Sequence, residues 1–255
     1  MNWDLVWPWL AGQQHEALRI PGVPTLLLQH LIYTLVPLLI AIAIALPIGL
    51  WVGHINKGGT LAVNVSNVGR AIPSLGIILI AYLALGRSLV PVFITLAAMA
   101  IPPILTNTYV GVREVDAEIR DAAAGMGLSG SEILLKVELP MALPIIMAGI
   151  RTSAVQVVAT ATLAAYLGYG GLGRPIFTGL ATSVQFNPDA KAAVIVAVVL
   201  VAIFAIVVEQ LFGLLERALV PNGIAAEQQQ HGGVPPASET GVGPAQPQEQ
   251  PAPVA

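Results

Sequence analysis

Long apolar runs with almost no charge are the feature that most constrains how this chain can fold. A bilayer core of about 30 Å needs ~20 apolar residues of helix at ~1.5 Å per residue. Five stretches of the sequence are long enough, at residues 26–53, 61–85, 89–112, 143–167 and 190–215. The chain is 56% hydrophobic and only 10% charged, too few charges to cover a soluble fold of 255 residues. The sequence therefore predicts an all-α polytopic membrane protein with about five transmembrane helices.

Composition and motif content also exclude several classes of function. The net charge is −3 and the 11 basic residues are scattered singly, so no electrostatic footprint for nucleic acid exists. The chain has no cysteine, and its four histidines are too widely spaced for a metal-ligand pattern. No G-x-x-x-x-G-K-[ST] loop is present to hold ATP phosphates. We therefore expect no catalytic residues, metal site, cofactor or nucleic-acid partner in this chain, and any ATP hydrolysis must occur on another chain.

Carboxylates are absent from most of the predicted membrane-spanning sequence. No Asp or Glu occurs between Glu16 and Glu114, or between Glu138 and Asp189. Carriers driven by protons or sodium place ionisable groups near the middle of the bilayer. The pattern argues against an ion-coupled secondary carrier and favours an external energy source such as ATP hydrolysis.

The two ends of the chain differ from the apolar centre. Residues 1–25 contain interfacial tryptophans and are predicted to form an extracytoplasmic or interfacial segment. Residues 219–255 are rich in Pro, Gln and Gly without apolar periodicity, which predicts a disordered tail. The positive-inside rule gives a weak bias, five basic residues against four, for an outside N-terminus and a cytoplasmic tail.

The polar segment 113–140 contains six of the fourteen acidic residues and can be divided into two helices. Asp116 is a predicted N-cap, and one apolar stripe is formed by Val115, Ile119, Ala122 and Met126. Gly127 stands where a left-handed residue ends a helix. Ser129 and Glu132 then form an S-x-x-E capping box for a second helix, which is expected to run toward Leu139 and Pro140. Helix chemistry leaves two interpretations open: a solvated loop, or a protrusion whose small residues fit a groove on a partner.

The spacing in this segment resembles a known family motif. Asp121-Ala122-Ala123, three residues, Gly127, nine residues and then Val137-Glu138-Leu139-Pro140 match the EAA loop, E-A-A-x3-G-x9-I-x-L-P, of ABC importer permeases. The departures are Asp for Glu at position 121 and Val for Ile at position 137. The resemblance covers about residues 26–218 and implies the type I ABC importer (MetI-like) permease fold, with 113–140 as a cytoplasmic coupling loop.

The resemblance also implies partners and a location. These are cytoplasmic ABC ATPase subunits, an extracytoplasmic substrate-binding protein, a second permease copy or paralogue, and the lipid bilayer of the bacterial inner membrane. The coupling residues carried over onto this sequence are Asp121, Ala122, Ala123 and Gly127, with Glu118 and Arg120 as flanking contacts.

A narrower likeness concerns the cargo. Residues 136–152 and 159–180 are most similar to permeases for glycine betaine, carnitine and choline, which implies osmoprotectant import. The same architecture could instead serve another small solute, such as an amino acid. Polar side chains in the spans are candidates for lining a weak translocation path, or else for hydrogen bonding between helices; they are Thr106, Asn107, Ser153, Gln156, Thr160 and Thr162.

Overall fold

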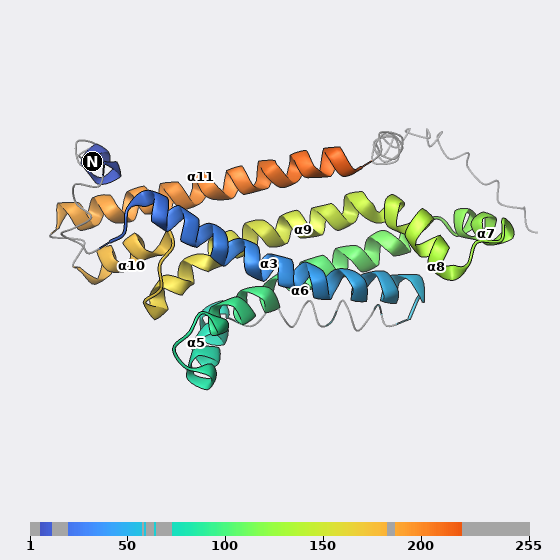
Figure 1. The fold of residues 1–255 in the computed structure, drawn as a ribbon, viewed down its shortest axis with the longest axis horizontal. Coiled ribbons are helices and arrows are strands. Elements are labelled where there is room, and N and C mark those ends of the chain that lie inside the picture. The colour runs from blue at the N-terminus through green and yellow to red at the C-terminus, as the bar shows by residue number, and fades with distance from the viewer. Residues whose placement is uncertain are drawn as a thin grey trace, which may run out of the picture. The chain divides into compact units, whose positions relative to one another are not determined.

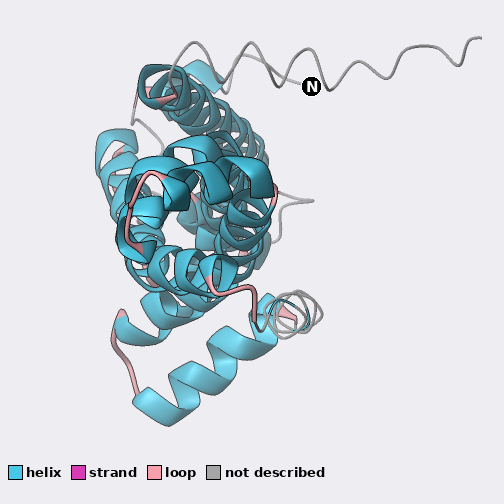
Figure 2. Cartoon of the chain, turned by 90° about the vertical axis from the view of Figure 1, so that its right-hand side faces the viewer, coloured by secondary structure: helices cyan, strands magenta, loops and turns pink. Residues whose placement is uncertain are grey.

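The computed structural model describes residues 6–11, 20–57, 59, 64, 73–182 and 187–220, all within the unit formed by residues 1–221. In this part of the chain every regular element is helical (Figure 2), which confirms the all-α prediction. The elements are α1 (Val6–Leu10), α3 (Val23–His54), α5 (Ser74–Leu85), α6 (Val90–Arg113), α7 (Ala117–Gly125), α8 (Gly130–Ile133), η2 (Leu134–Glu138), α9 (Leu139–Ala161), η3 (Thr162–Leu167), α10 (Gly173–Ala181) and α11 (Pro188–Leu219). The predicted tail lies outside the described residues beyond position 220, as does most of the predicted N-terminal segment.

Four helical stretches of the described chain are long and apolar enough to cross a membrane. They are Val23–His54, Val90–Arg113, Gly130–Leu167 and Pro188–Leu219. They correspond to four of the five predicted spans. The remaining predicted span, 61–85, lies partly outside the described residues. Its described part is α5, whose 12 residues cover only about 18 Å at the α-helical rise.

Helices α3 and α6 run in the same direction. A Cβ at Gly49 would meet Thr108, and one at Gly53, four residues on, would meet Val112, so the two helices run parallel. For two successive long helices to be parallel, the chain between His54 and Val90 has to lead from the end of α3 back to the level of its start. That connection contains α5, so the described helices agree with a five-crossing topology.

Small residues bring these helices together. Gly49 and Gly53 form a G-x-x-x-G motif, and a Cβ at either position would lie 2.7 Å from the Cβ of its neighbour on α6. On α9, a Cβ at Gly149 would lie 2.6 Å from the Cβ of Asn107. Lipid tails are as apolar as leucine, so helix association in membranes depends on such close packing.

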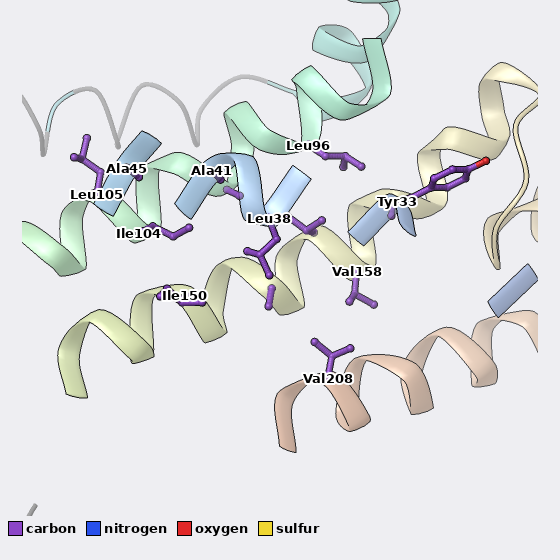
Figure 3. Close-up of a cluster of buried hydrophobic side chains, with 14 of the residues drawn as sticks. Tyr33, Leu38, Ala41, Ala45, Leu96, Ile104, Leu105, Ile150, Val158 and Val208 are labelled. Carbon is purple, nitrogen blue, oxygen red and sulfur yellow. The ribbon is translucent and has the colours of Figure 1, made fainter. Parts of the chain in front are cut away.

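A central cluster of buried apolar side chains joins α3, α6, α9 and α11 (Figure 3). Its members include Tyr33, Leu38, Ala41, Ala45, Leu96, Ile104, Leu105, Ile150, Val158 and Val208. Other large apolar residues on α3 and α11, such as Leu39 and Ile203, are exposed. Exposed apolar side chains along these helices fit a lipid-facing surface.

The two ends of this bundle carry different elements (Figure 1). The α7–α8 pair lies at the end where α3 finishes, and α10 lies at the opposite end. The loop before α10 is fixed to the start of α3, where the Leu172 backbone N–H donates to His30 Nδ1 at 3.3 Å and His30 Nε2 contacts the Val158 carbonyl at 3.1 Å. The polar segment 113–140 therefore lies at one end of the membrane helices.

Candidate functional site: the α7–α8 segment

Helix α7 begins as its sequence predicts. The side chain of Asp116 accepts a hydrogen bond from the Glu118 backbone N–H at 2.9 Å. This bond satisfies one of the N–H groups that the first helical turn leaves without a partner. The predicted N-cap is confirmed, and it sets the residue at which the chain turns out of α6 into α7.

The end of α7 is a Schellman motif built on Gly127. Its φ of +87° lies in the left-handed region. The Gly127 N–H donates to the Ala124 carbonyl at 2.9 Å, and the Leu128 N–H donates to the Ala123 carbonyl at 3.2 Å. The first is the 5→2 bond and the second the 6→1 bond that together define a Schellman motif. Glycine is needed here because a side chain disfavours this backbone conformation.

The second helix starts with the predicted capping box. Glu132 Oε2 accepts from the Ser129 backbone N–H at 3.0 Å and from the Ser129 hydroxyl at 2.8 Å. This helix reaches Leu139 and Pro140 and runs on past them, because α8 continues through the π-helical η2 into α9. Proline has no N–H to donate, so the wider turn ahead of it costs less than it would elsewhere.

The first turns of this continuous helix lie beyond its membrane part. The 38 residues of Gly130–Leu167 would extend about 57 Å, well over a ~30 Å bilayer core. In the polar part, hydrogen bonds from Lys136 and then from Ser129 lower the pKa of Glu132 to about 2. The capping carboxylate therefore stays charged at every physiological pH.

The outward face of α7 contains most of the residues of the motif. Glu118, Asp121 and Ala122 are exposed, whereas Ala123 is only 2% exposed and packs against the rest of the chain. Of the predicted apolar stripe, Val115 is buried, whereas Ile119 is 40% and Met126 is 74% exposed. Exposed apolar side chains beside small residues and a carboxylate are typical of a protein-docking surface.

A hollow borders this surface. Its volume is about 530 Å³, and it is lined by Asn56, Arg113, Glu114, Val115, Asp116, Ala117, Arg120 and Asp121. It therefore combines both signs of charge beside the exposed face of α7. Such a recess can receive a protruding side chain of a partner.

Behind α7 lies a buried carboxylate that the sequence analysis did not single out. Glu138 is 1% exposed; it is hydrogen-bonded to His54 Nδ1 at 2.7 Å and makes an ion pair with Arg120 Nε at 3.2 Å. The sequence offered one indication of a buried charge, namely a glutamate inside the otherwise apolar Val137-Glu138-Leu139-Pro140. Its partners are 84 and 18 positions earlier in the sequence, so only the tertiary structure brings them together.

The predicted path residues fall into two groups, and in the first group Ser153 and Asn107 make contacts within or between the membrane helices. The Ser153 hydroxyl, fully buried, donates across helices to the Ala100 carbonyl at 2.9 Å. Asn107 donates within α6 to the Pro103 carbonyl at 2.8 Å and contacts Gly149 closely. Thr106, on the same helix, is half-buried.

The second group is half-buried and lies at the far end of α9 and the start of η3. Gln156 and Thr160 are four residues apart, and the Thr160 hydroxyl donates to the Gln156 carbonyl at 2.7 Å. The Thr162 hydroxyl donates to the Ala159 carbonyl, also at 2.7 Å. The hydroxyls of Thr160 and Thr162 are thus bonded to carbonyls close by in the sequence. All three side chains remain partly accessible to other molecules.

Helices α9 and α11 are also joined by charge. Arg151 Nη2 donates to Glu209 Oε1 at 2.8 Å, and Arg151 Nη1 lies 3.8 Å from Glu216 Oε2. The guanidinium is therefore neutralised by a neighbouring helix within the chain. Pairing of this kind makes an arginine tolerable at membrane depth.

Comparison with known proteins places this geometry in a family. Residues 45–221 match the family model described as binding-protein-dependent transport system inner membrane component. The chain is 39% identical to the carnitine transport permease protein OpuCB of Listeria monocytogenes over 77% of its own length and 87% of the relative's. It is 35% identical to the glycine betaine/carnitine/choline transport system permease protein OpuCB of Bacillus subtilis, with coverage of 77% and 88%.

Solved structures agree on the fold. A chain of the MetNI methionine ABC transporter in an inward-facing conformation superposes with a TM-score of 0.64 at 21% identity, covering 79% of this chain and all of that one. At this identity the likeness establishes the fold, which is that of a type I ABC importer permease. Together with the family match over more than half of the sequence, it leads to one conclusion: the chain belongs to the family of inner-membrane permease components of binding-protein-dependent ABC transport systems.

Proposed function

We propose that this permease imports glycine betaine, carnitine, choline or a related quaternary-ammonium solute, driven by ATP hydrolysis on separate ATPase subunits. The observation that carries the coupling part is the α7 surface, on which Asp121, Ala122 and Met126 are exposed at the end of the membrane helices. The cargo follows from the relatives, which are named for these solutes.

The proposed orientation places α7 and α8 in the cytoplasm, where ATP is available. The start of α3 then lies outside and the end of α11 inside. Two permease copies, or this chain and a paralogue, would enclose the path. ATP-driven closure of the ATPase pair would move α7 and switch access from one side to the other, which requires an element with two states that both sites bias.

Solute selection is proposed to reside mainly in a separate extracytoplasmic binding protein. Quaternary ammonium groups are held by several aromatic rings at once. The tyrosines in the described helices lie on four different elements: Tyr33 on α3, Tyr82 on α5, Tyr109 on α6 and Tyr166 on η3. Tyr33 is buried in the core, and Tyr166 packs edge-on against Phe177 at 5.7 Å. The path within the permease, with Gln156, Thr160 and Thr162 as candidates, then needs only weak contacts.

Uptake by the reconstituted complex tests this function. The permease, its ATPase and its binding protein are placed in proteoliposomes with ATP inside and labelled glycine betaine, carnitine, choline or amino acids outside. We expect ATP-dependent uptake of the quaternary-ammonium solutes. Uptake of amino acids alone would assign the same architecture to a different cargo, and uptake without ATP or ATPase would identify a secondary carrier.

Reversing the charge of Asp121 tests the docking surface. Asp121→Lys should reduce the ATPase recovered with the permease by about tenfold or more, because losing one member of a desolvated charge pair costs at least 2 kcal/mol or so. The matched control is Asp189→Lys, which makes the same charge change at the start of α11, at the opposite end of the membrane helices (Figure 1). Equal recovery of the ATPase with both variants would place the docking site elsewhere.

A further inference from the structure

The buried carboxylate of Glu138 joins segments that are distant in sequence. Its Oε2 lies 2.7 Å from Nδ1 of His54, the last residue of α3. Its Oε1 lies 3.2 Å from Nε of Arg120, in the middle of α7. Arg120 Nη2 also donates to the carbonyl of Val112, in the last turn of α6. We refer to His54, Glu138 and Arg120 as the triad.

The triad attaches α7 to the end of α3 and to the start of the long helix that contains α9. Within this helix only Ala123 is buried, so apolar packing on the rest of the chain is small. Hydrophobic contact has no preferred direction. The hydrogen bonds between His54 and Glu138 and from Arg120 Nη2 to the Val112 carbonyl do have one, and the ion pair of Arg120 with Glu138 adds attraction. Arg120 is 19% exposed and its guanidinium points toward Glu138 and Val112, not toward the outward face.

A buried ion pair is a poor device for stability alone. Burying a carboxylate costs free energy that its partners only partly return, and well-packed apolar residues of similar volume often stabilise as much or more. Among the described residues, Glu138 is the one acidic side chain that is buried. Its burial at the junction of α3, α6 and α7 indicates a geometric role.

We propose that Glu138 is a positioning residue that fixes the orientation of α7 relative to α3 and α6, so that movement of α7 is carried into the membrane helices. This proposal rests on the proposed function, in which α7 receives force from an ATPase. It assigns Arg120 to the internal attachment of α7, in place of the flanking partner contact expected from the motif. Glu118 and Asp121 remain on the outward face for the partner.

A spin-label distance measurement on the full chain in lipid nanodiscs tests the orientation directly. The chain has no cysteine, so introduced cysteines are its only thiols. One label pair, Trp51→Cys with Met126→Cys, reports α7 against α3; both positions are exposed. A reference pair, Ile40→Cys with Ile94→Cys, reports α3 against α6.

Neutralising the carboxylate should loosen α7 alone. In Glu138→Gln we expect the α7 distance distribution to broaden by about twofold, since the charge-assisted contacts are lost, while the reference distribution stays narrow. The matched control, Lys136→Gln, breaks the exposed ion pair of Lys136 with Glu132 in the same segment and should change neither distribution. An unchanged α7 distribution in Glu138→Gln would overturn the proposal, and so would equal broadening of the reference pair.

A double variant separates positioning from stability. Glu138→Gln leaves Arg120 as an unpaired charge, and adding Arg120→Gln removes that charge, so resistance to heating should recover. The α7 distribution should stay broad in the double variant, because the directional contacts are still missing. A distribution that narrows again as stability recovers would show that the triad contributes stability only.

Coupling efficiency in the complete transporter gives the functional readout. With Glu138→Gln we expect the amount of solute transported per ATP hydrolysed to fall about threefold or more. The reason is that a loosely held α7 does not pass its movement on to the membrane helices. The amount of ATPase recovered with the permease should be unchanged. An unchanged ratio would contradict the proposal. If the parent complex transports nothing, the proposed function is wrong, but the nanodisc measurement needs no ATPase and still decides on the triad.

Discussion

Gly127→Pro should reduce ATP-driven uptake to background while the protein still inserts into the membrane. Gly127 has a φ of +87° and its N–H is bonded to the Ala124 carbonyl. Proline holds φ near −65° and has no N–H, so both the conformation and the bond are lost. The strain and the missing bond cost about 2–3 kcal/mol together, and the larger effect is that the chain leaves α7 in a different direction. Uptake by proteoliposomes and the yield of membrane-inserted protein are the measurements.

Two substitutions serve as controls for this result. Gly125→Ala adds a methyl group two residues earlier, also into open space, but at a helical φ, so uptake should be retained. Gly127→Asn should keep most of the activity because asparagine tolerates the left-handed region. Uptake at the parent rate by Gly127→Pro would refute the idea that the turn after α7 is needed for coupling.

Gly49→Ile should prevent stable packing of α3 on α6. A Cβ at this position would lie 2.7 Å from Thr108 Cβ and 3.2 Å from the backbone oxygen of Leu105, so the helices must separate to admit it. Overpacking at a close helix contact costs about 3 kcal/mol or more when the backbone has to move. The fraction of monodisperse protein left after heating in detergent measures the loss.

The control for this change adds the same side chain to an exposed position of the same helix. Ala43→Ile, one and a half turns earlier on α3, faces outward and should leave heat resistance unchanged. Equal losses in both variants would mean that isoleucine harms α3 wherever it stands. Equal survival of both would show that the G-x-x-x-G contact is not required for the packing of α3 on α6.

Local chemistry explains the features of the α7–α8 segment that could be predicted from sequence. The Asp116 cap, the left-handed Gly127 and the Ser129–Glu132 capping box each involve residues within a few positions of one another. Such interactions depend little on the rest of the fold. The long apolar runs that form the membrane helices are equally local, and for the same reason they could be predicted.

Features that depend on distant parts of the chain could not be predicted in this way. The apolar stripe did not tell which side of α7 packs on the rest of the chain; in the structure Arg120 and Ala123 lie on that side, toward Glu138. Likewise, Ser153 was an equally good candidate for the path and for packing until α6 placed the Ala100 carbonyl 2.9 Å from its hydroxyl.

The sequence by itself determined the membrane class, the all-helical fold and the ends of the short helices, because each follows from hydrophobicity or from hydrogen bonds between near neighbours. The tertiary structure alone decided that α3 and α6 run parallel, which face of α7 is free, and that His54 and Arg120 meet the carboxylate of Glu138. The physical reason is that ion pairs and close helix contacts depend on distances in space, and a helical sequence fixes those distances only within a few turns.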